Sequence, residues 1–151
     1  MTTNIGQSEG WAAWVDGTAC PNPGRMAIGI VLVAPDGRRT EWSQALGRSG
    51  CNNEAELRAI DTALGLAMQQ GATRLTVLSD SRFAVDCLNG IETTMVEPLA
   101  GLLHATRQRL SDFDAIELRW LPRHRNAEAD RLARAALGLV PKKTKANRSK
   151  R

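Results

Sequence analysis

The amino-acid sequence predicts one α/β domain: a five-stranded mixed sheet, with three antiparallel strands followed by two parallel ones, flanked by helices. Two observations lead to this fold class. The first third of the chain holds three β-rich segments separated by turn residues, whereas helical and short β segments alternate after residue 52. The length of 151 residues and the lack of internal repeats favour one domain, which we expect to span residues 10–140.

The antiparallel half is predicted from residues 11 to 46. Residues 11–16 form an apolar run that ends in an acid, and a tight loop is expected around residues 20–24. Residues 26–33 are apolar and β-branched, the turn residues 35–37 close a hairpin, and residues 40–46 form the third strand.

The second half should contain parallel strands and helices. The clearest helix covers residues 53–70, because its apolar residues recur at helical spacing and Gly71 follows as a stop. The remaining elements are expected in this order: strand 75–78, helix 81–88, helix from Pro98 to 110, strand 115–121 and helix 126–137, with Gly138 as its stop.

Composition and charge limit the function classes. No apolar run is long enough to span a membrane, and the polar start shows no secretory signal. Three widely spaced cysteines, Cys20, Cys51 and Cys87, are typical of reduced thiols, so we expect a cytoplasmic protein that has no membrane partner.

The net charge of +4 is unevenly distributed along the chain. Six cations and no acid lie in the last ten residues, which leaves residues 1–141 with 14 cations, 16 anions and a net charge of −2. We expect residues 1–9 to be flexible and residues 141–151 to be a disordered basic tail. The tail suits a polyanion such as nucleic acid, although a merely solvated end is an equal alternative.

Four acids occupy positions that favour one shared site. Asp16 ends the first predicted strand and Asp80 the fourth, where ligands gather in open sheets. Glu56 and Asp130 lie on helix stripes that should face the sheet, where unpaired carboxylates are costly. Each acid alone has an ordinary explanation as a turn residue, a helix cap or a stripe edge. Four such positions together favour convergence.

Converging carboxylates need a counter-charge. Two unit charges about 4 Å apart repel by about 4 kcal/mol at an effective dielectric of 20. Oxygen ligands favour Mg²⁺, with Mn²⁺ as an alternative, and no organic cofactor is implied. Two such ions support in-line attack on a phosphodiester.

The motifs and their order resemble type 1 ribonuclease H over residues 11–138. The segments that carry this resemblance are Trp14-Val-Asp-Gly-Thr18, Asn22-Pro-Gly24, Asn52-Asn-Glu-Ala-Glu-Leu57, Ser79-Asp-Ser81, His124-Arg-Asn126 and Ala129-Asp-Arg-Leu-Ala133. The resemblance implies a ribonuclease H-like fold and a monomeric endonuclease that cuts the RNA strand of RNA–DNA hybrids. Cleavage by two metal ions would leave 5′-phosphate and 3′-hydroxyl ends.

The resemblance also implies roles for single residues. The metal-binding and catalytic carboxylates correspond to Asp16, Glu56, Asp80 and Asp130, whereas Glu54 should face elsewhere. His124 corresponds to a catalytic histidine that shuttles protons or helps product release, and phosphate contact is its alternative role. The positions implied to contact substrate are Asn22, Cys51, Asn52, Asn53 and Asn126.

The sequence departs from the family pattern in three places. Cys51 stands where the family often has threonine, a stronger donor to a DNA phosphate, although Ser49 is a substitute. The loop between His124 and Asp130 is short. Residues 89–96 lack the basic excursion that grips DNA in some members, and we expect the basic tail to replace it.

Two rival functions and one packing question stay open. The same fold serves exonucleases and junction resolvases, and a non-catalytic hybrid-binding module is the second rival. The four tryptophans lie on predicted strands, where core packing is expected and base stacking is the alternative. His104, on a helix far from the motifs, should be structural or exposed.

Overall fold

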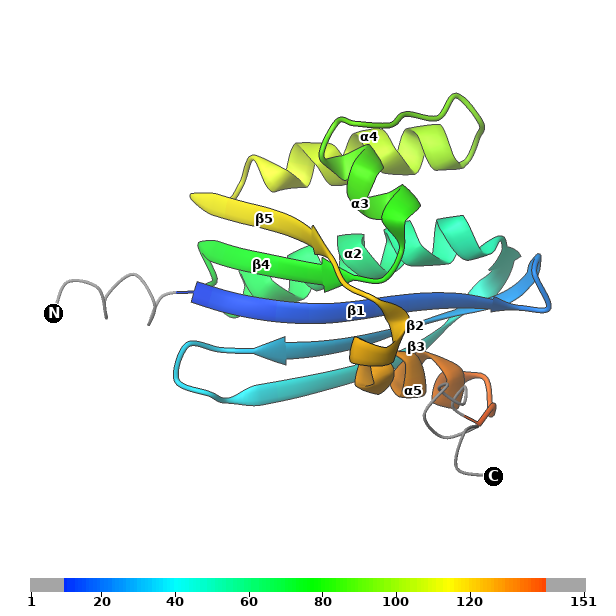
Figure 1. The fold of residues 1–151 in the computed structure, drawn as a ribbon, viewed down its shortest axis with the longest axis horizontal. Coiled ribbons are helices and arrows are strands. Elements are labelled where there is room, and N and C mark those ends of the chain that lie inside the picture. Colours follow the sequence, from blue (N-terminus) through cyan, green and yellow to red (C-terminus); the bar gives the residue numbers. More distant parts are fainter. Residues whose placement is uncertain (1–9, 141–151) are drawn as a thin grey trace, which may run out of the picture.

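The strands and helices occur in the predicted order in the computed structural model, which describes residues 10–140 (Figure 1). The predicted flexible start and basic tail lie outside the described residues. The elements are β1 (Gly10–Cys20), β2 (Gly24–Val33), β3 (Arg39–Gly50), α2 (Asn52–Gln69), β4 (Arg74–Ser79), α3 (Arg82–Leu88), α4 (Leu99–Leu110), β5 (Ala115–Trp120), the short 3₁₀ helix η1 (Arg123–Arg125) and α5 (Ala127–Ala136).

The five strands form one mixed sheet in the order β3-β2-β1-β4-β5. β1 pairs antiparallel with β2, and β2 with β3, whereas β1, β4 and β5 run parallel. The predicted fold class is therefore confirmed. β1 is the central strand and belongs to both halves, so the topological switch lies beside it.

β1 is longer than predicted, and Asp16 is not at its end. The parallel pairing of β1 with β4 stops at Val15 and Ser79, but its antiparallel pairing with β2 continues to Cys20 and Arg25. Alternation in residues 11–16 could not reveal this, because the extra residues are held by a hairpin partner. Asp16 still lies at the edge of the parallel half, since β4 ends beside it.

Helices cover both faces of the sheet (Figure 1). On one face, α2 packs its apolar stripe on β1 and β2. Val15, Ile30, Ile60, Leu64 and Val77 are fully buried in the same core. Burying each such side chain stabilises the fold by about 1.5–3 kcal/mol. On the other face, α5 packs against β1, β2 and β3. The sheet is thus fixed between two helices that carry predicted acids.

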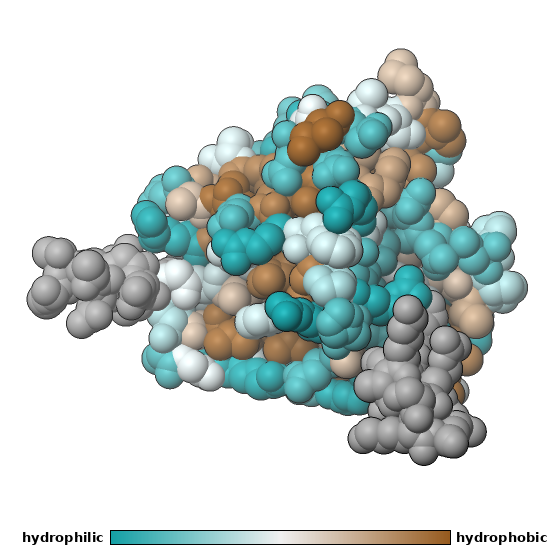
Figure 2. Space-filling view, in the orientation of Figure 1, coloured by the Kyte–Doolittle hydropathy of each residue, from teal (hydrophilic) through white to brown (hydrophobic). Residues whose placement is uncertain are grey.

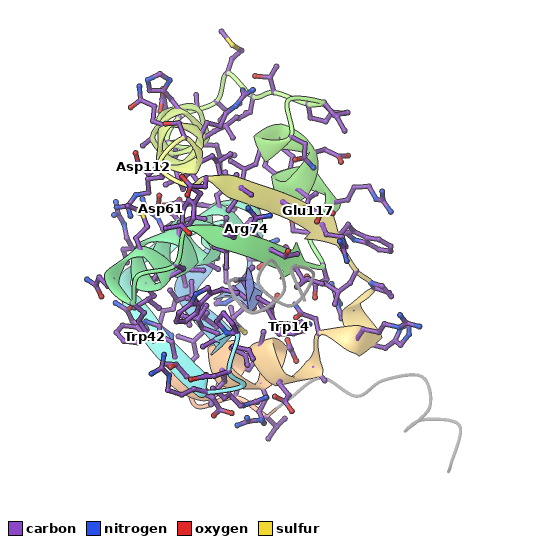
Figure 3. The ribbon with its side chains drawn as sticks, turned by 90° about the vertical axis from the view of Figure 1, so that its left-hand side faces the viewer. Trp14, Trp42, Asp61, Arg74, Asp112 and Glu117 are labelled. Carbon is purple, nitrogen blue, oxygen red and sulfur yellow. The ribbon has the colours of Figure 1, made fainter. Side chains whose placement is uncertain are left out.

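α2 and α4 are tied together by a polar contact as well as by packing. The buried Thr106 of α4 donates a hydrogen bond to Asp61 of α2 at 3.1 Å, and Arg109 pairs with the same carboxylate at 3.2 Å. Asp61 lies on α2 where that helix faces α4 (Figure 3). This contact fixes the outer layer away from the predicted site.

The tryptophans do not all pack in the core, so that expectation is wrong for two of them. Trp42 and Trp120 are each 38% exposed. Trp42 lies toward the edge of the molecule on β3, whereas Trp14 lies nearer the centre, close to α5 (Figure 3). Edge strands leave one side of a large ring without a covering helix, and sequence periodicity does not show which strands lie at the edges.

The surface combines hydrophilic residues with small apolar groups. Figure 2 shows hydrophobic side chains scattered among hydrophilic ones on one face of the molecule. Three large apolar residues, Ile91, Met95 and Val96, are exposed between α3 and α4. No helix among residues 10–140 is both long and apolar enough to cross a membrane. His104 is exposed on α4, as predicted.

Candidate active site

Three of the predicted acids meet at the end of the parallel strands. Asp16, Glu56 and Asp80 each offer a carboxylate oxygen, and these oxygens lie within 4.8 Å of one another. Asp16 follows the last pair between β1 and β4, and Asp80 follows the other member of that pair. Adjacent parallel strands therefore bring the two aspartates together, although 64 positions separate them in the chain.

A glycine allows α2 to bring Glu56 to this point. A Cβ on Gly17 would lie 2.1 Å from the backbone oxygen of Ala55, so only glycine permits the close crossing of β1 and α2. The Gly17 N–H then donates to Glu56 Oε1 at 3.0 Å. Glu54 faces elsewhere, as expected: it is buried and pairs with Arg58 at 2.8 Å.

Asp130 joins the group from the other face of the sheet. A Cβ on Gly29 of β2 would lie 2.2 Å from the backbone oxygen of Ala129, so α5 also approaches the sheet through a glycine. Asp130 lines the same cavity as the three other acids and interacts with Asp16. All four predicted carboxylates therefore face one cavity.

Burial and repulsion by neighbouring acids make Asp16 and Glu56 hard to ionise. Burial, followed by the charges of Asp80 and Asp130, holds the pKa of Asp16 well above its usual value, and Arg123 partly opposes the shift. Burial, followed by the charges of Asp16 and Asp80, likewise raises the pKa of Glu56 well above its usual value. The Gly17 N–H lowers it in part. A bound divalent cation would remove this penalty by supplying positive charge.

The donor set fits a hard cation. The three clustered ligand atoms are all carboxylate oxygens, and neither histidine nor cysteine belongs to the group. Oxygen-only ligands suit Mg²⁺ or Mn²⁺ and not zinc, which takes nitrogen and sulfur ligands in most sites. Asp16, Glu56 and Asp80 therefore lie close enough together to hold such a cation.

Three asparagines, the asparagine wall, also line the acid cavity, which has a volume of about 470 Å³. Asn52 accepts a hydrogen bond from the Ala19 N–H at 2.8 Å, and Asn22 accepts one from the Asn52 N–H at 3.0 Å. Both carboxamide oxygens are therefore bonded to backbone, which fixes these side chains. Together with the exposed Asn53, their amide groups line the cavity as potential donors to a ligand.

Two predicted substrate contacts have other roles in the structure. Cys51 caps α2, because its Sγ accepts the Glu54 N–H at 3.4 Å, and it is not among the described residues that line the acid cavity. Asn126 is only 1% exposed and donates to Val15 and Asp80. This burial contradicts a direct substrate contact for Asn126. Its neighbours in the sequence, Arg125 and Ala127, are both exposed, so the burial of Asn126 could not be inferred from pattern.

The structure does not bring His124 into the acid cavity. It is exposed on η1 and lines a second cavity of about 330 Å³, together with Trp14, Val31 and Val33. Its neighbour Arg123 lines the acid cavity instead. Successive residues of a 3₁₀ helix point about 120° apart, so adjacent side chains reach different surroundings.

Three cationic side chains at the acid cavity were not predicted as site residues. Arg82, Arg123 and Arg134 all line it. The guanidinium of Arg82 lies 4.2 Å from the centre of the Trp120 ring, and Trp120 Nε1 donates to the Asp80 backbone oxygen at 3.2 Å. Closeness in sequence to predicted site residues could have identified two of them, because Arg82 follows Asp80 by two residues and Arg123 directly precedes His124. Arg131, also beside an acid in sequence, instead contacts Glu41 at 3.8 Å.

Comparison with known proteins gives consistent relatives. Residues 14–136 match the family model described as reverse transcriptase-like. A bifunctional protein of Mycobacterium tuberculosis is 36% identical over 81% of this chain and 34% of its own length. Ribonuclease HI of Halobacterium salinarum is 35% identical over 83% of this chain and 63% of its own length. The chain therefore spans about a third and just under two thirds of these two relatives.

Solved structures agree with the sequence relatives. The crystal structure of ribonuclease H1 from Halobacterium salinarum superposes with a TM-score of 0.81 at 33% identity, covering 85% of this chain and 98% of that one. A ribonuclease H1 isolated from compost, solved in complex with an RNA/DNA hybrid, superposes with a TM-score of 0.78 at 25% identity, covering 85% and 96%.

Proposed function

The chain belongs to the type 1 ribonuclease H family, and from this premise we propose that it is a metal-dependent endonuclease that hydrolyses the RNA strand of RNA–DNA hybrids. The observation that carries the proposal is the convergence of carboxylate oxygens from β1, α2 and the end of β4 within 4.8 Å. Clustered carboxylates repel one another and do not stabilise a packed domain. A metal-dependent phosphodiester hydrolase needs them, because they hold its cations.

In this proposal Asp16, Glu56, Asp80 and Asp130 would hold two Mg²⁺ ions, with Mn²⁺ as an alternative. Such a pair would supply the charge needed to activate water and to stabilise the leaving oxygen, and the expected products carry 5′-phosphate and 3′-hydroxyl ends. The surrounding residues contribute by positioning the carboxylates. Gly17 and Gly29 let two helices approach the sheet closely, and the Gly17 N–H orients Glu56.

The asparagine wall supports recognition of the hybrid. The side chains of Asn22 and Asn52 are fixed by backbone donors, so their amide groups meet a ligand with little further ordering. We propose that these two residues and Asn53 contact the 2′-hydroxyl groups and phosphates next to the cut, because the 2′-hydroxyl distinguishes RNA from DNA. A hybrid bound by the compost relative supports this substrate class.

The role of His124 is proposed as one of two alternatives. Proton transfer would require the side chain to turn toward the acid cavity, whereas contact with a backbone phosphate is compatible with its exposed position on η1. Monomeric state and cytoplasmic location remain predictions from the sequence.

A cleavage assay tests the proposed function against both rivals. End-labelled hybrid, duplex DNA, duplex RNA and a branched DNA junction are incubated with Mg²⁺, with Mn²⁺ and with a chelator. Internal cuts in the RNA strand of the hybrid, abolished by the chelator, are expected. Stepwise shortening from an end would identify an exonuclease, cuts in branched DNA a resolvase, and binding without cleavage a non-catalytic module.

A further inference from the structure

Asn126 is the most unusual polar residue in the described part of the chain. Its side chain is 1% exposed, and its Oδ1 is the one buried side-chain polar atom of residues 10–140 that has no hydrogen-bond partner. Buried amides are normally fully bonded, because desolvating them is unfavourable. An incompletely bonded amide at this position therefore needs an explanation beyond packing.

The amide group of Asn126 links two parts of the acid cluster. Its Nδ2 donates to the Val15 backbone oxygen at 2.8 Å and to Asp80 Oδ2 at 3.4 Å. Val15 directly precedes Asp16, and the Asn126 backbone oxygen accepts the Asp130 N–H at 3.1 Å. One residue is thus connected to three of the four acids, through a strand, a carboxylate and a helix turn.

Two simpler roles for Asn126 do not fit. Asparagine often caps a helix, and Asn126 precedes α5, but its side chain makes no capping hydrogen bond there. Contact with substrate would require exposure, which it lacks. The remaining interaction of the side chain is the pair of bonds to β1 and Asp80.

We propose that Asn126 is a positioning residue that holds the Asp80 carboxylate, and the strand that carries Asp16, in the arrangement required to bind the divalent cations. This inference rests on the proposed function. An amide suits the task because its two hydrogens match two acceptors and it adds no negative charge to four acids. Its single bond to Oδ2 leaves the other Asp80 lone pairs available to a cation.

The test is metal binding without substrate, measured by calorimetric titration of Mg²⁺ and Mn²⁺ into the full chain. Asn126→Ala should weaken binding by about tenfold, the lower range for loss of a partner of a metal ligand. The matched control is Asn89→Ala, which also removes an amide-to-carbonyl bond, to Leu118 at 3.2 Å, but lies apart from the acids. The control should bind metal within twofold of wild type.

Kinetics separate positioning from substrate contact. At subsaturating Mg²⁺, Asn126→Ala should need about tenfold more metal for half-maximal cleavage, while the KM for hybrid at saturating metal stays within twofold. A raised KM with unchanged metal affinity would identify a substrate contact and overturn the proposal. Wild-type metal affinity in Asn126→Ala, or an equal loss in Asn89→Ala, would also overturn it.

A second variant covers the case in which Asn126→Ala does not fold. Asn126→Ser keeps one donor hydrogen in a shorter side chain, so it should weaken metal binding by about threefold to tenfold. Wild-type affinity in this variant would contradict the proposal. Failure of the proposed function is recognised differently, because the wild-type chain itself would then neither bind the cations nor cleave the hybrid.

Discussion

The segment from Arg123 to Asn126 contributes lining residues to two cavities, and the two differ in the charge of their linings. The acid cavity is lined by four carboxylates and three asparagines. The second cavity is lined by apolar residues that include Trp14, Val31 and Val33, by His124, and by a single acid, Glu128, beside two arginines. Neighbouring residues of η1 are divided between the two, so position along the sequence did not decide which side chain reaches the acids.

Both regions contain a cavity, so the presence of a cavity does not identify the candidate active site. The clustered carboxylates do. Asp16 and Glu56 have raised pKa values because they are buried among other acids, whereas the acid of the second cavity, Glu128, is exposed and pairs with Arg39. An unfavourable arrangement maintained in a fold indicates function. Substitutions at the two cavities should therefore differ in their effects on activity.

Removing one carboxylate charge from the acid cavity should nearly abolish turnover. We expect Asp80→Asn to lower kcat by roughly a thousandfold, because the cations lose a ligand, while hybrid affinity changes by less than about threefold. Glu128→Gln in the second cavity is the control and should retain wild-type kcat. Intact turnover in Asp80→Asn would show that Asp80 has been assigned wrongly.

Substitutions at Arg123 and His124, which are adjacent on η1, should affect different kinetic constants. Arg123→Ala should raise the KM for hybrid by about tenfold and reduce its salt dependence by about one phosphate contact, because Arg123 lines the acid cavity. His124→Ala should lower kcat by less than about tenfold if it contacts a phosphate from the second cavity.

The His124→Ala variant also tests whether His124 acts only from the second cavity. A fall of about a hundredfold in kcat for His124→Ala would show that His124 turns into the acid cavity and transfers protons. Arg125→Ala is the control, since Arg125 lines the second cavity like His124.

Deleting residues 141–151 tests the basic tail predicted from the sequence. The deletion removes six cations, so the KM for hybrid should rise by roughly fivefold at moderate salt and become less salt-dependent. The value of kcat should stay nearly unchanged, because the four acids are all retained. An unaltered KM at low and moderate salt would contradict a role for the tail in substrate binding.

The acid cavity should also make stability depend on pH. The folded-state pKa values of Asp16 and Glu56 are raised above their unfolded values of about 4, so the folded state binds more protons. Their stabilising contribution is fully present below pH 4 and is lost as pH rises through the raised folded-state pKa. The Tm of metal-free protein should therefore fall by a few degrees from pH 5 to pH 8 relative to a variant lacking the cluster charge.

Asp16→Asn provides that variant, and the exposed Asp112→Asn is its matched control. Thermal unfolding with a chelator should show a flatter pH dependence for Asp16→Asn only. Adding Mg²⁺ should raise the wild-type Tm most at pH 8. The carboxylates have lost their protons at that pH, so the cation binds them and offsets their repulsion. An identical pH dependence in wild type and Asp16→Asn would contradict the raised pKa assigned to Asp16.

Local patterns were sufficient for much of this molecule. Residues 53–70 repeat apolar side chains at helical spacing, and Gly71 and Gly138 have positive φ angles at helix ends, as expected of helix stops. The order of elements followed from such patterns, because periodicity and turn residues are properties of adjacent positions. The residue types and order of the acids, compared with a known family, were enough to select Asp16, Glu56, Asp80 and Asp130 as candidates.

Only the tertiary structure decided which side chains share an environment. It extended β1 through a hairpin partner, exposed Trp42 and Trp120, placed Arg123 instead of His124 at the acids, and buried Asn126 between a strand and Asp80. Each outcome depends on elements far apart in sequence, and on direction around a helix or strand. Residue types and their order indicated which chemistry was available. Packing decided which groups meet, because burial and contact depend on residues that are distant in the chain.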